Sequence, residues 1–447
     1  MTRWYADLAW LGGEQARAGV LIETDGDRIR SVSPGAARPP DAVHLAGLAL
    51  PGLANAHSHA FHRALRGRTQ GGAGTFWSWR EQMYAISERL DPDTYYSLAR
   101  ATYAEMALAG VTCVGEFHYL HHGPGGAPYA DPNAMGLALT AAAADAGIRI
   151  TLLDTCYLAG GFGAELAGPQ LRFGDRSADA WAERAALLAP GPRARVGAAI
   201  HSVRAVPPGA LGVVAGWAAE RDTPLHMHLS EQPAENAACR SAHGCTPTEL
   251  LSRHGALGPH STAVHATHLG VADVSLLAAA GTAVCLCPTT ERDLADGIGP
   301  ARALGAAGVP LCLGSDSHAM IDLLEEARAV ELDERLASRT RGHWRADELL
   351  SAACAAGHAA LGWPDAGRIA AGALADFVTV DLASVRTAGA DMTTAVQAAV
   401  FAACAADIRD VVVGGRRIVA NGRHTMIADV AAELGAAILT VGKPANA

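Results

Sequence analysis

The stretch that decides the fold is residues 48–59, LALPGLANAHSH, an uncharged and mostly apolar run that ends in two histidines. Short apolar runs with nearby Pro and Gly are typical of strands buried on both faces. Side chains two residues apart on a strand point to the same face, so His57 and His59 can reach one point together. The run therefore predicts a buried strand with a pair of imidazoles at its carboxyl end.

The same pattern of a short apolar run followed by His, Glu or Asp recurs downstream, with segments of helical periodicity in between. One such segment, Pro92–Ala109, has a helix start signal, because Asp91 can cap it and Pro92 suits the first helical position. The predicted strands are Leu48–Ala56, Thr112–Phe117, Arg149–Thr155, Val196–Ile200, Pro224–His228, Thr262–His265, Thr282–Cys287 and Pro310–Gly314. This alternation predicts an α/β fold, a (β/α)8 barrel of the TIM type, with a doubly wound sheet as the less favoured alternative.

The two ends of the chain have a different pattern of apolar and polar residues from the middle. Short alternating runs broken by turns occupy residues 1–50, and the same alternation returns at residues 376–381 and 411–419, where Gly414 and Gly415 indicate a hairpin turn. We therefore expect three parts. They are a small β-sandwich-like domain built from residues 1–50 and 371–422, a metal-dependent barrel of residues 51–370, and a helical C-terminal tail of residues 423–447.

Composition narrows the classes of protein that fit. Half of the 447 residues are hydrophobic and 18% are charged, which excludes a disordered or fibrous chain. The net charge is -10, and the basic residues form no run of the kind that binds nucleic acid. No uncharged apolar stretch reaches the ~18 residues of a membrane span, and nine scattered cysteines fit a reducing compartment. We expect a soluble cytoplasmic protein that acts on a small molecule.

Lysine chemistry is excluded from the predicted barrel. Lys443, in the C-terminal tail, is the single lysine among the 35 basic residues. A Schiff-base lysine, a P-loop lysine and a carbamylated lysine that bridges two metals therefore have no counterpart in the barrel. A metal site in this chain is expected to hold one ion.

Four residues at predicted strand ends indicate such a metal site. In a (β/α)8 barrel, catalytic side chains lie at the carboxyl ends of the strands. His57 and His59 follow the first predicted strand, His228 ends the fifth, and Asp316 follows the eighth. Imidazole is a preferred ligand of zinc and iron, and three histidines with one carboxylate leave a position open for water. That arrangement is typical of a catalytic rather than a structural metal.

Two more polar residues are candidates for proton transfer. Glu231 lies three residues past His228, in the loop that leaves the fifth strand, where it can reach a metal-bound water. Its structural alternative is an acid at the start of a helix before Pro233. His265 ends the sixth strand without an evident packing role.

Several motifs together resemble the amidohydrolase superfamily, in its deaminase-like branch. They are residues 51–59 (PGLANAHSH), the pair His228 and Glu231, and residues 264–269 (VHATHL), 287–289 (CPT) and 314–316 (GSD). Residues 367–377 (GRIAAGALADF) are similar to the segment by which those enzymes return to their β-domain. The resemblance covers almost the whole chain and implies a metal-dependent hydrolase with a barrel fold.

Within that branch, residues 76–84 (FWSWREQMY), 115–122 (GEFHYLHH), 288–291 (PTTE) and 314–318 (GSDSH) resemble the formimidoylglutamate deiminases. The resemblance implies hydrolysis of the formimino group of N-formimino-L-glutamate to N-formyl-L-glutamate and ammonia, in histidine degradation, by a homodimer. It also implies one Zn2+ per chain, with Fe2+ as the alternative metal.

The same resemblance implies a role for each of the singled-out residues. The metal ligands are His57, His59, His228 and Asp316, the catalytic residues are Glu231, His265 and Asp316, and the substrate contacts are Arg80, Tyr119, His201 and Arg204. His62 is a further substrate-contact candidate, and it stands where those enzymes are expected to carry a glutamine.

Arginines suit this substrate because a glutamate derivative presents two carboxylates, which guanidinium groups bind bidentately. Arg204 follows the fourth strand and Arg80 lies in the long segment after the first, although an ion-paired surface arginine is the alternative for each. Other functions also remain open at this point. They are a nucleobase or related aminohydrolase, an amide hydrolase, and a noncatalytic metal-binding protein, in which Glu231 and His265 would have no role.

Overall fold

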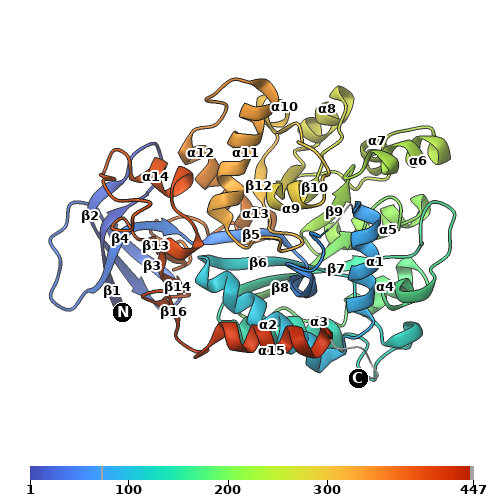
Figure 1. Ribbon diagram of the computed structural model, residues 1–447, viewed down its shortest axis with the longest axis horizontal. Coiled ribbons are helices and arrows are strands. Elements are labelled where there is room, and N and C mark those ends of the chain that lie inside the picture. Colours follow the sequence, from blue (N-terminus) through green and yellow to red (C-terminus); the bar gives the residue numbers. More distant parts are fainter. Residues whose placement is uncertain (72–73, 443–447) are drawn as a thin grey trace.

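The centre of the computed structural model, which describes residues 1–71 and 74–442, is a barrel of parallel strands (Figure 1). The strands follow one another in chain order around the barrel. They are β5 (Leu53–Ser58), β6 (Val111–His118), β7 (Arg149–Cys156), β8 (Ala194–Ile200), β9 (Leu225–Leu229), β10 (Ser261–His265), β11 (Ala283–Leu286) and β12 (Leu311–Leu313). The predicted (β/α)8 barrel is confirmed.

The barrel closes between its last strand and its first. Just beyond β12, Asp316 forms a parallel bridge with Ser58, and the amide of Asp316 donates to the carbonyl of His57 over 3.0 Å. Gly314 permits this close approach, because a Cβ at that position would lie 2.7 Å from the Cβ of His57. The closure brings Asp316 next to the histidines at the end of β5.

Helices surround the barrel (Figure 1). The predicted helix is α2 (Pro92–Leu108), and it starts as expected, because the side chain of Asp91 accepts the amide of Thr94 over 2.8 Å. The other elements of this region are η1 (Ala60–Leu65), α1 (Phe76–Ser87), η2 (Pro124–Gly126), α3 (Ala134–Ala146), η3 (Gly168–Arg172), α4 (Ala178–Ala185), α5 (Pro208–Glu220), α6 (Pro233–His243), α7 (Pro247–Arg253), α8 (Val271–Ala280), α9 (Pro288–Asp293), α10 (Ala301–Ala306), α11 (Leu323–Ser338), α12 (Ala346–Ser351), the π-helical η4 (Ala352–Ala356) and α13 (Gly357–Ala360).

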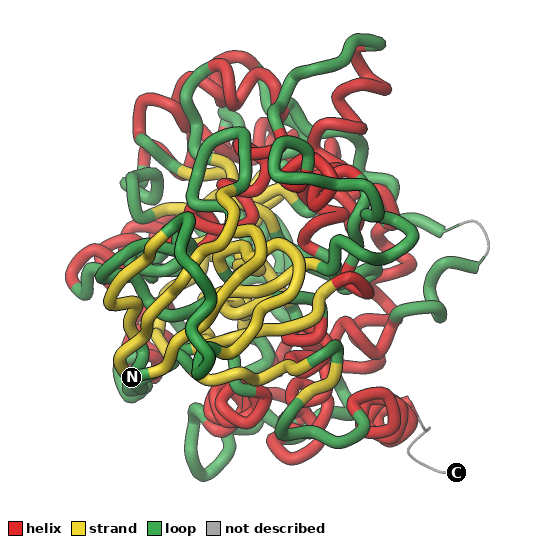
Figure 2. Tube along the Cα trace, turned by 90° about the vertical axis from the view of Figure 1, so that its left-hand side faces the viewer, coloured by secondary structure: helices red, strands yellow, loops and turns green. Residues whose placement is uncertain are grey.

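The two ends of the chain form a second sheet, which faces the viewer in Figure 2. Its strands are β1 (Thr2–Ala9), β2 (Arg17–Asp25), β3 (Arg28–Ser33), β4 (Val43–Pro51), β13 (Phe377–Val380), β14 (Ile408–Val413), β15 (Arg416–Ala420) and β16 (Arg423–His424). The strand order is β16-β15-β14-β13-β4-β1-β2-β3, so the pairing of β13 with β4 joins the two chain ends. The expected small β-domain built from both ends is therefore present, while its exact boundaries stay a prediction.

The first predicted strand, Leu48–Ala56, is wrong in its extent, because the chain changes sheets within it. β4 ends in the outer sheet, and β5 begins in the barrel one residue after Gly52. The amide of Gly52 donates to the carbonyl of Asp376 over 3.0 Å, and a Cβ at Gly52 would lie 2.1 Å from Oγ1 of Thr112. Apolar side chains continue through the crossover because both strands are buried, so hydrophobicity alone could not reveal it.

The short elements α14 (Ala395–Phe401) and η5 (Ala405–Asp407) lie between β13 and β14. After β16, the last strand of the second sheet, the chain returns to the barrel, where the final helix α15 (Val430–Gly442) packs along α2 and Glu433 pairs with Arg100. Lys443 lies outside the described residues. Among residues 1–71 and 74–442, no helix combines the length and the apolar character needed to cross a membrane.

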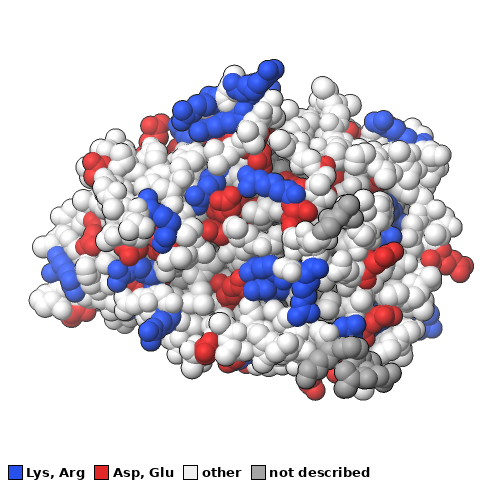
Figure 3. All heavy atoms as spheres, in the orientation of Figure 1, with Lys and Arg blue, Asp and Glu red and all other residues white. Residues whose placement is uncertain are grey.

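Charges of both signs are interspersed on the face shown in Figure 3. The largest group of basic side chains lies at the upper edge of this view, in the region where Figure 1 labels α10 and α12. Acidic side chains lie close to the basic ones over much of the rest of this face.

Candidate active site

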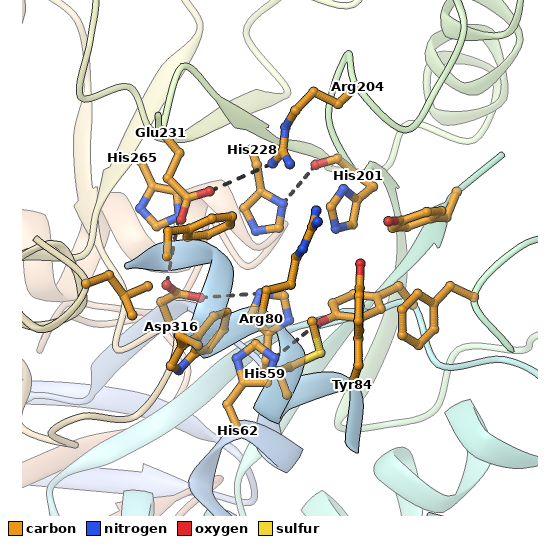
Figure 4. A pocket seen from close by; sticks show the side chains of 17 residues that line it. His59, His62, Arg80, Tyr84, His201, Arg204, His228, Glu231, His265 and Asp316 are labelled. Atoms are coloured by element: carbon orange, nitrogen blue, oxygen red, sulfur yellow. Dashed lines mark hydrogen bonds and ion pairs between the residues drawn. The ribbon is translucent and has the colours of Figure 1, made fainter. Parts of the chain in front are cut away.

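The ends of β5 and β9 and the segment after β12 bring the four predicted metal ligands together, and Figure 4 shows three of them, His59, His228 and Asp316. Nε2 of His57 and Nε2 of His59 lie 3.2 and 3.3 Å from Oδ1 of Asp316, and Nε2 of His228 lies 3.2 Å from Nε2 of His57. All four side chains are buried. Nitrogen and oxygen donors that converge in this way form a set that a divalent metal can bind.

Hydrogen bonds on the far side of two rings direct their lone pairs toward that point. Nδ1 of His59 donates to the carbonyl of Phe117 over 2.9 Å, and Nδ1 of His228 donates to the carbonyl of His201 over 2.8 Å. A neutral imidazole that donates through Nδ1 keeps its lone pair on Nε2, which is the atom that faces the cluster. Burial lowers the pKa of both rings and so favours the neutral form that binds metal. The residues present therefore fit a divalent metal such as zinc.

Two further histidines lie at the edge of the cluster. Potential ligand atoms of His57, His228, His265 and Asp316 lie within 4.8 Å of one another, and the same holds for His59, His62 and Asp316. His265 and Asp316 both adopt positive φ angles, +67° and +39°, which are unfavourable for residues other than glycine. Such strain persists only where the surrounding structure holds it, and here it aims two side chains at one point.

Glu231 and His265 face each other beside the cluster. Nε2 of His265 lies 3.8 Å from Oε1 of Glu231 and also 3.8 Å from Oδ2 of Asp316. Burial raises the pKa of Glu231, whereas for His265 the neighbouring carboxylates outweigh burial and raise its pKa. Helix α6 begins after Gln232, so Glu231 is not its capping residue. A buried carboxyl group next to an imidazole is suited to passing a proton.

The sequence did not single out Glu291 as a site residue, although it had marked the segment that contains it. Oε1 of Glu291 lies 3.5 Å from Nδ1 of His265, on the side of the ring that faces away from Glu231. The same oxygen accepts the amide of Cys287 over 2.9 Å. An acid in the first turn of a helix, here α9, is ordinary by itself, so the sequence held no signal for this contact.

All five predicted substrate-contact residues line one cavity together with three of the four metal-ligand candidates. The residues in question are His62, Arg80, Tyr119, His201 and Arg204, and the same cavity is bordered by His59, His228, Glu231, His265 and Asp316. Figure 4 shows Arg204 and Arg80 entering the cavity from different sides, toward the space in front of His201.

Arg204 is held from behind by Glu235, a second residue that the sequence did not indicate. Nε of Arg204 donates to Oε2 of Glu235 over 3.0 Å, and Nη2 lies 4.0 Å from Oε2 of Glu231. The side chain of Glu235 is fully buried, and its Oε1 accepts the amide of Ser230 over 3.4 Å. Because Glu235 binds Nε from the side, the guanidinium end of Arg204 stays available to the cavity.

Arg80 is positioned by aromatic rings instead of a carboxylate. Its guanidinium carbon lies 4.5 Å from the ring centre of Trp77 and 5.5 Å from that of Tyr84, at distances where cation–π attraction operates. Its Nε is buried and has no hydrogen-bond partner among the described residues. Arg80 therefore keeps donors for a ligand.

His62 is tied to Tyr119, with 3.0 Å between Nε2 and the phenolic oxygen. Burial lowers the pKa of His62 to about 3, so the ring is neutral. Its Nδ1 is buried without a partner in the described part of the chain. A neutral ring with one free nitrogen can take the place of the amide expected at this position.

A separate group of metal-ligand type lies elsewhere in the barrel. Ligand atoms of His118, His121 and Asp154 lie within 4.8 Å of one another. Asp154 is already bound by two nitrogens of Arg184, each at 2.9 Å, and by the indole of Trp181 at 2.8 Å. The positive charge of Arg184 disfavours a cation there, so this group is a buried ion-pair network.

Comparison with known proteins agrees with the geometry. Residues 48–418 match the model of the amidohydrolase family. A formimidoylglutamate deiminase of Pseudomonas aeruginosa is 37% identical over 95% of this chain and 96% of its own length, and an 8-oxoguanine deaminase of the same organism is 30% identical over 92% and 90%. Among solved structures, atrazine chlorohydrolase TrzN from Arthrobacter aurescens TC1, complexed with zinc, is 25% identical with a TM-score of 0.87, covering 99% of this chain and 100% of that chain.

Proposed function

The chain belongs to the amidohydrolase family, and from that premise we propose that it hydrolyses the formimino group of N-formimino-L-glutamate to N-formyl-L-glutamate and ammonia. The observation that carries the proposal is the pair Arg80 and Arg204 in the same cavity as His59, His228 and Asp316 of the His/Asp cluster. A substrate with a hydrolysable C=N bond at one end and carboxylates at the other matches that distribution of charge. The formimidoylglutamate deiminase relative supports the same substrate.

We further propose one Zn2+ per chain, with Fe2+ as the alternative, held by His57, His59, His228 and Asp316. The donor set and the zinc complex of TrzN support this assignment. When bound, the ion supplies a water of lowered pKa and polarises the group under attack.

The protein's own residues then divide the proton transfers. Asp316 accepts a proton from the attacking water, whose oxygen forms a bond to the imino carbon. Glu231 passes a proton to the nitrogen that leaves, and His265 donates a hydrogen bond to the developing tetrahedral centre. Overall, HN=CH–NH–R and water give O=CH–NH–R and ammonia, so atoms and charge balance.

A related aminohydrolase acting on a nucleobase is the second candidate, because the 8-oxoguanine deaminase relative also aligns over most of the chain. Two arginines have no evident partner on a neutral base, which favours the glutamate derivative. A noncatalytic metal-binding role leaves the Glu231–His265 pair without a purpose. The homodimer, the place in histidine degradation and the cytoplasmic location stay predictions.

Ammonia release from a panel of substrates tests the proposal. We expect turnover of N-formimino-L-glutamate and none of guanine, 8-oxoguanine or adenosine. Release from a nucleobase without release from formiminoglutamate would replace the proposal with the second candidate. Absence of any turnover in protein loaded with zinc or iron would favour the noncatalytic role.

A further inference from the structure

A second cavity, which opens to solvent, adjoins the active-site cavity. The two share Arg80, Tyr157, His201 and Arg204 in their linings, so they meet at the arginines. The catalytic steps proposed above use only the first cavity. The second cavity therefore has no role in those steps.

The residues that line the second cavity are mostly small and apolar. The loop from Ala159 to Phe162, which contains two glycines, forms one side, and Ala234 and Ala238 of α6 form another, with Trp77 of α1 nearby. Because glycine and alanine side chains are small, they leave room for atoms of a ligand. Their surface favours contact with apolar ligand atoms.

One uncompensated positive charge remains in the lining of the second cavity, that of Arg80, and the proposed function already assigns it to a carboxylate of the substrate. Arg204 and Glu235 are paired at 3.0 Å and compensate each other. The guanidinium of Arg80 lies against Trp77 and is shared with the active-site cavity. A small neutral group therefore suits the second cavity better than another carboxylate does.

The substrate orientation in the proposed function indicates which end of the substrate would carry such a neutral group. If the formimino carbon lies at the His/Asp cluster, the side-chain carboxyl of glutamate is the end of the substrate farthest from it along the chain. The arginines at the junction of the two cavities are its binding partners in the proposed function. A substituent on that carboxyl continues past the arginines into the second cavity.

We propose that the protein also hydrolyses the formimino group of neutral side-chain amides of N-formimino-L-glutamate that carry a small apolar substituent. This inference rests on the proposed function, because it uses the same catalytic groups and the same orientation. Water again supplies the oxygen, the C=N bond is replaced by C=O, and ammonia leaves. The amide bond to the substituent stays intact, so no co-reactant beyond water is required.

Three substrates separate the new activity from the old one. N-formimino-L-glutamate reports on the proposed function, N-formimino-L-glutamine removes the side-chain charge, and the N-formimino derivative of γ-glutamylethylamide adds two carbons to that neutral amide. We expect the ethylamide to show about 15-fold higher kcat/KM than N-formimino-L-glutamine, because each of its two added carbons contributes about fourfold when buried. An ethylamide no better than the primary amide overturns the inference, whatever the rate with formiminoglutamate.

A pair of neighbouring variants tests where the ethyl group binds. Ala238→Trp should fill the second cavity and abolish the advantage of the ethylamide, while kcat/KM for N-formimino-L-glutamate changes by less than about twofold. Ala237→Trp is the matched control, because Ala237 is exposed on the same helix and lies outside that lining. If Ala238→Trp lowers the rates of all three substrates equally, the cavity is an entry route and the inference fails. Failure of formiminoglutamate alone would overturn the proposed substrate and leave the amide activity standing.

Discussion

The two ends of the active-site cavity are built in different ways. At the cluster end, His57 and His228 belong to barrel strands, His59 and Asp316 follow strands directly, and the backbone of Asp316 is bonded to that of His57. At the arginine end, Arg80 lies on helix α1 and Arg204 on the connection after β8, and each is oriented by side chains, namely Trp77 and Glu235.

From this difference we expect the cluster end to govern the chemistry and the arginine end to govern the choice of substrate. Groups fixed by sheet hydrogen bonds are held to the tight tolerances that proton transfer needs. Groups on connections vary more easily without disturbing the barrel, and in the proposed function they contact the part of the substrate that does not react. Substitutions at the cluster end should therefore change kcat most, and those at the arginine end should change the preference among substrates.

The largest effect is expected at the closure of the barrel. Asp316→Asn should lower kcat by about 1,000-fold or more with a much smaller change in KM, because the carboxylate acts on the attacking water. Steady-state kinetics with formiminoglutamate and metal analysis of the dialysed protein check this, with Ser317→Ala as a neighbouring control. If the variant mainly raises KM and leaves kcat nearly unchanged, Asp316 binds substrate instead of acting on the attacking water.

Glu231→Gln should lower kcat by at least ~100-fold and leave the metal content nearly intact, because Gln cannot pass a proton. Metal analysis alongside kinetics gives the answer. If the variant loses its metal, Glu231 is a ligand, and if it keeps full activity, the residue has only a structural role.

The number of metal ions bound per chain is a further test of the cluster end. Metal analysis of active, dialysed protein should find one equivalent per chain, since the Asp316-centred cluster provides four converging ligands and the described part of the barrel contains no lysine to bridge a second ion. A requirement for two equivalents for the full rate would contradict this. The nearness of His62 to His59 and Asp316 makes that measurement informative.

At the arginine end, Arg204→Ala should lower kcat/KM for formiminoglutamate by roughly 30-fold or more, since removal of a bidentate charged contact from an enclosed site costs ~2–5 kcal/mol. The loss should be much smaller with N-formimino-L-glutamine, which already lacks the side-chain carboxylate. Equal losses with both substrates would show that Arg204 does not bind that carboxylate.

The smallest effect is expected at Glu235, which contacts Arg204 and does not line the active-site cavity. Glu235→Gln keeps a hydrogen-bond acceptor for Nε but removes the charge, so KM should rise by about 10-fold while kcat changes little. Glu235→Asp, which keeps the charge, should recover part of the loss. A fall in kcat without a change in KM would instead tie Glu235 to the catalytic pair.

Much of the barrel was predictable because its strands are buried on both faces and its helices carry local start signals. The helix after Asp91 follows from one acid and one proline, and the structure reproduces it nearly to the residue. The strand predicted over Leu48–Ala56 was wrong in extent because apolar residues continue through the change of sheets at Gly52. Periodicity records burial, and it does not record which sheet a strand joins.

The order of the strands, the single lysine, and the presence of His, Glu and Asp at strand ends follow from residue types and their spacing along the chain. The contact of Glu235 with Arg204, the contact of Glu291 with His265, and the meeting of a second cavity with the first at the arginines are visible only in the folded protein. These contacts join side chains from different elements, and both acids sit in first turns of helices, where an acid is favourable whether or not it touches a catalytic group.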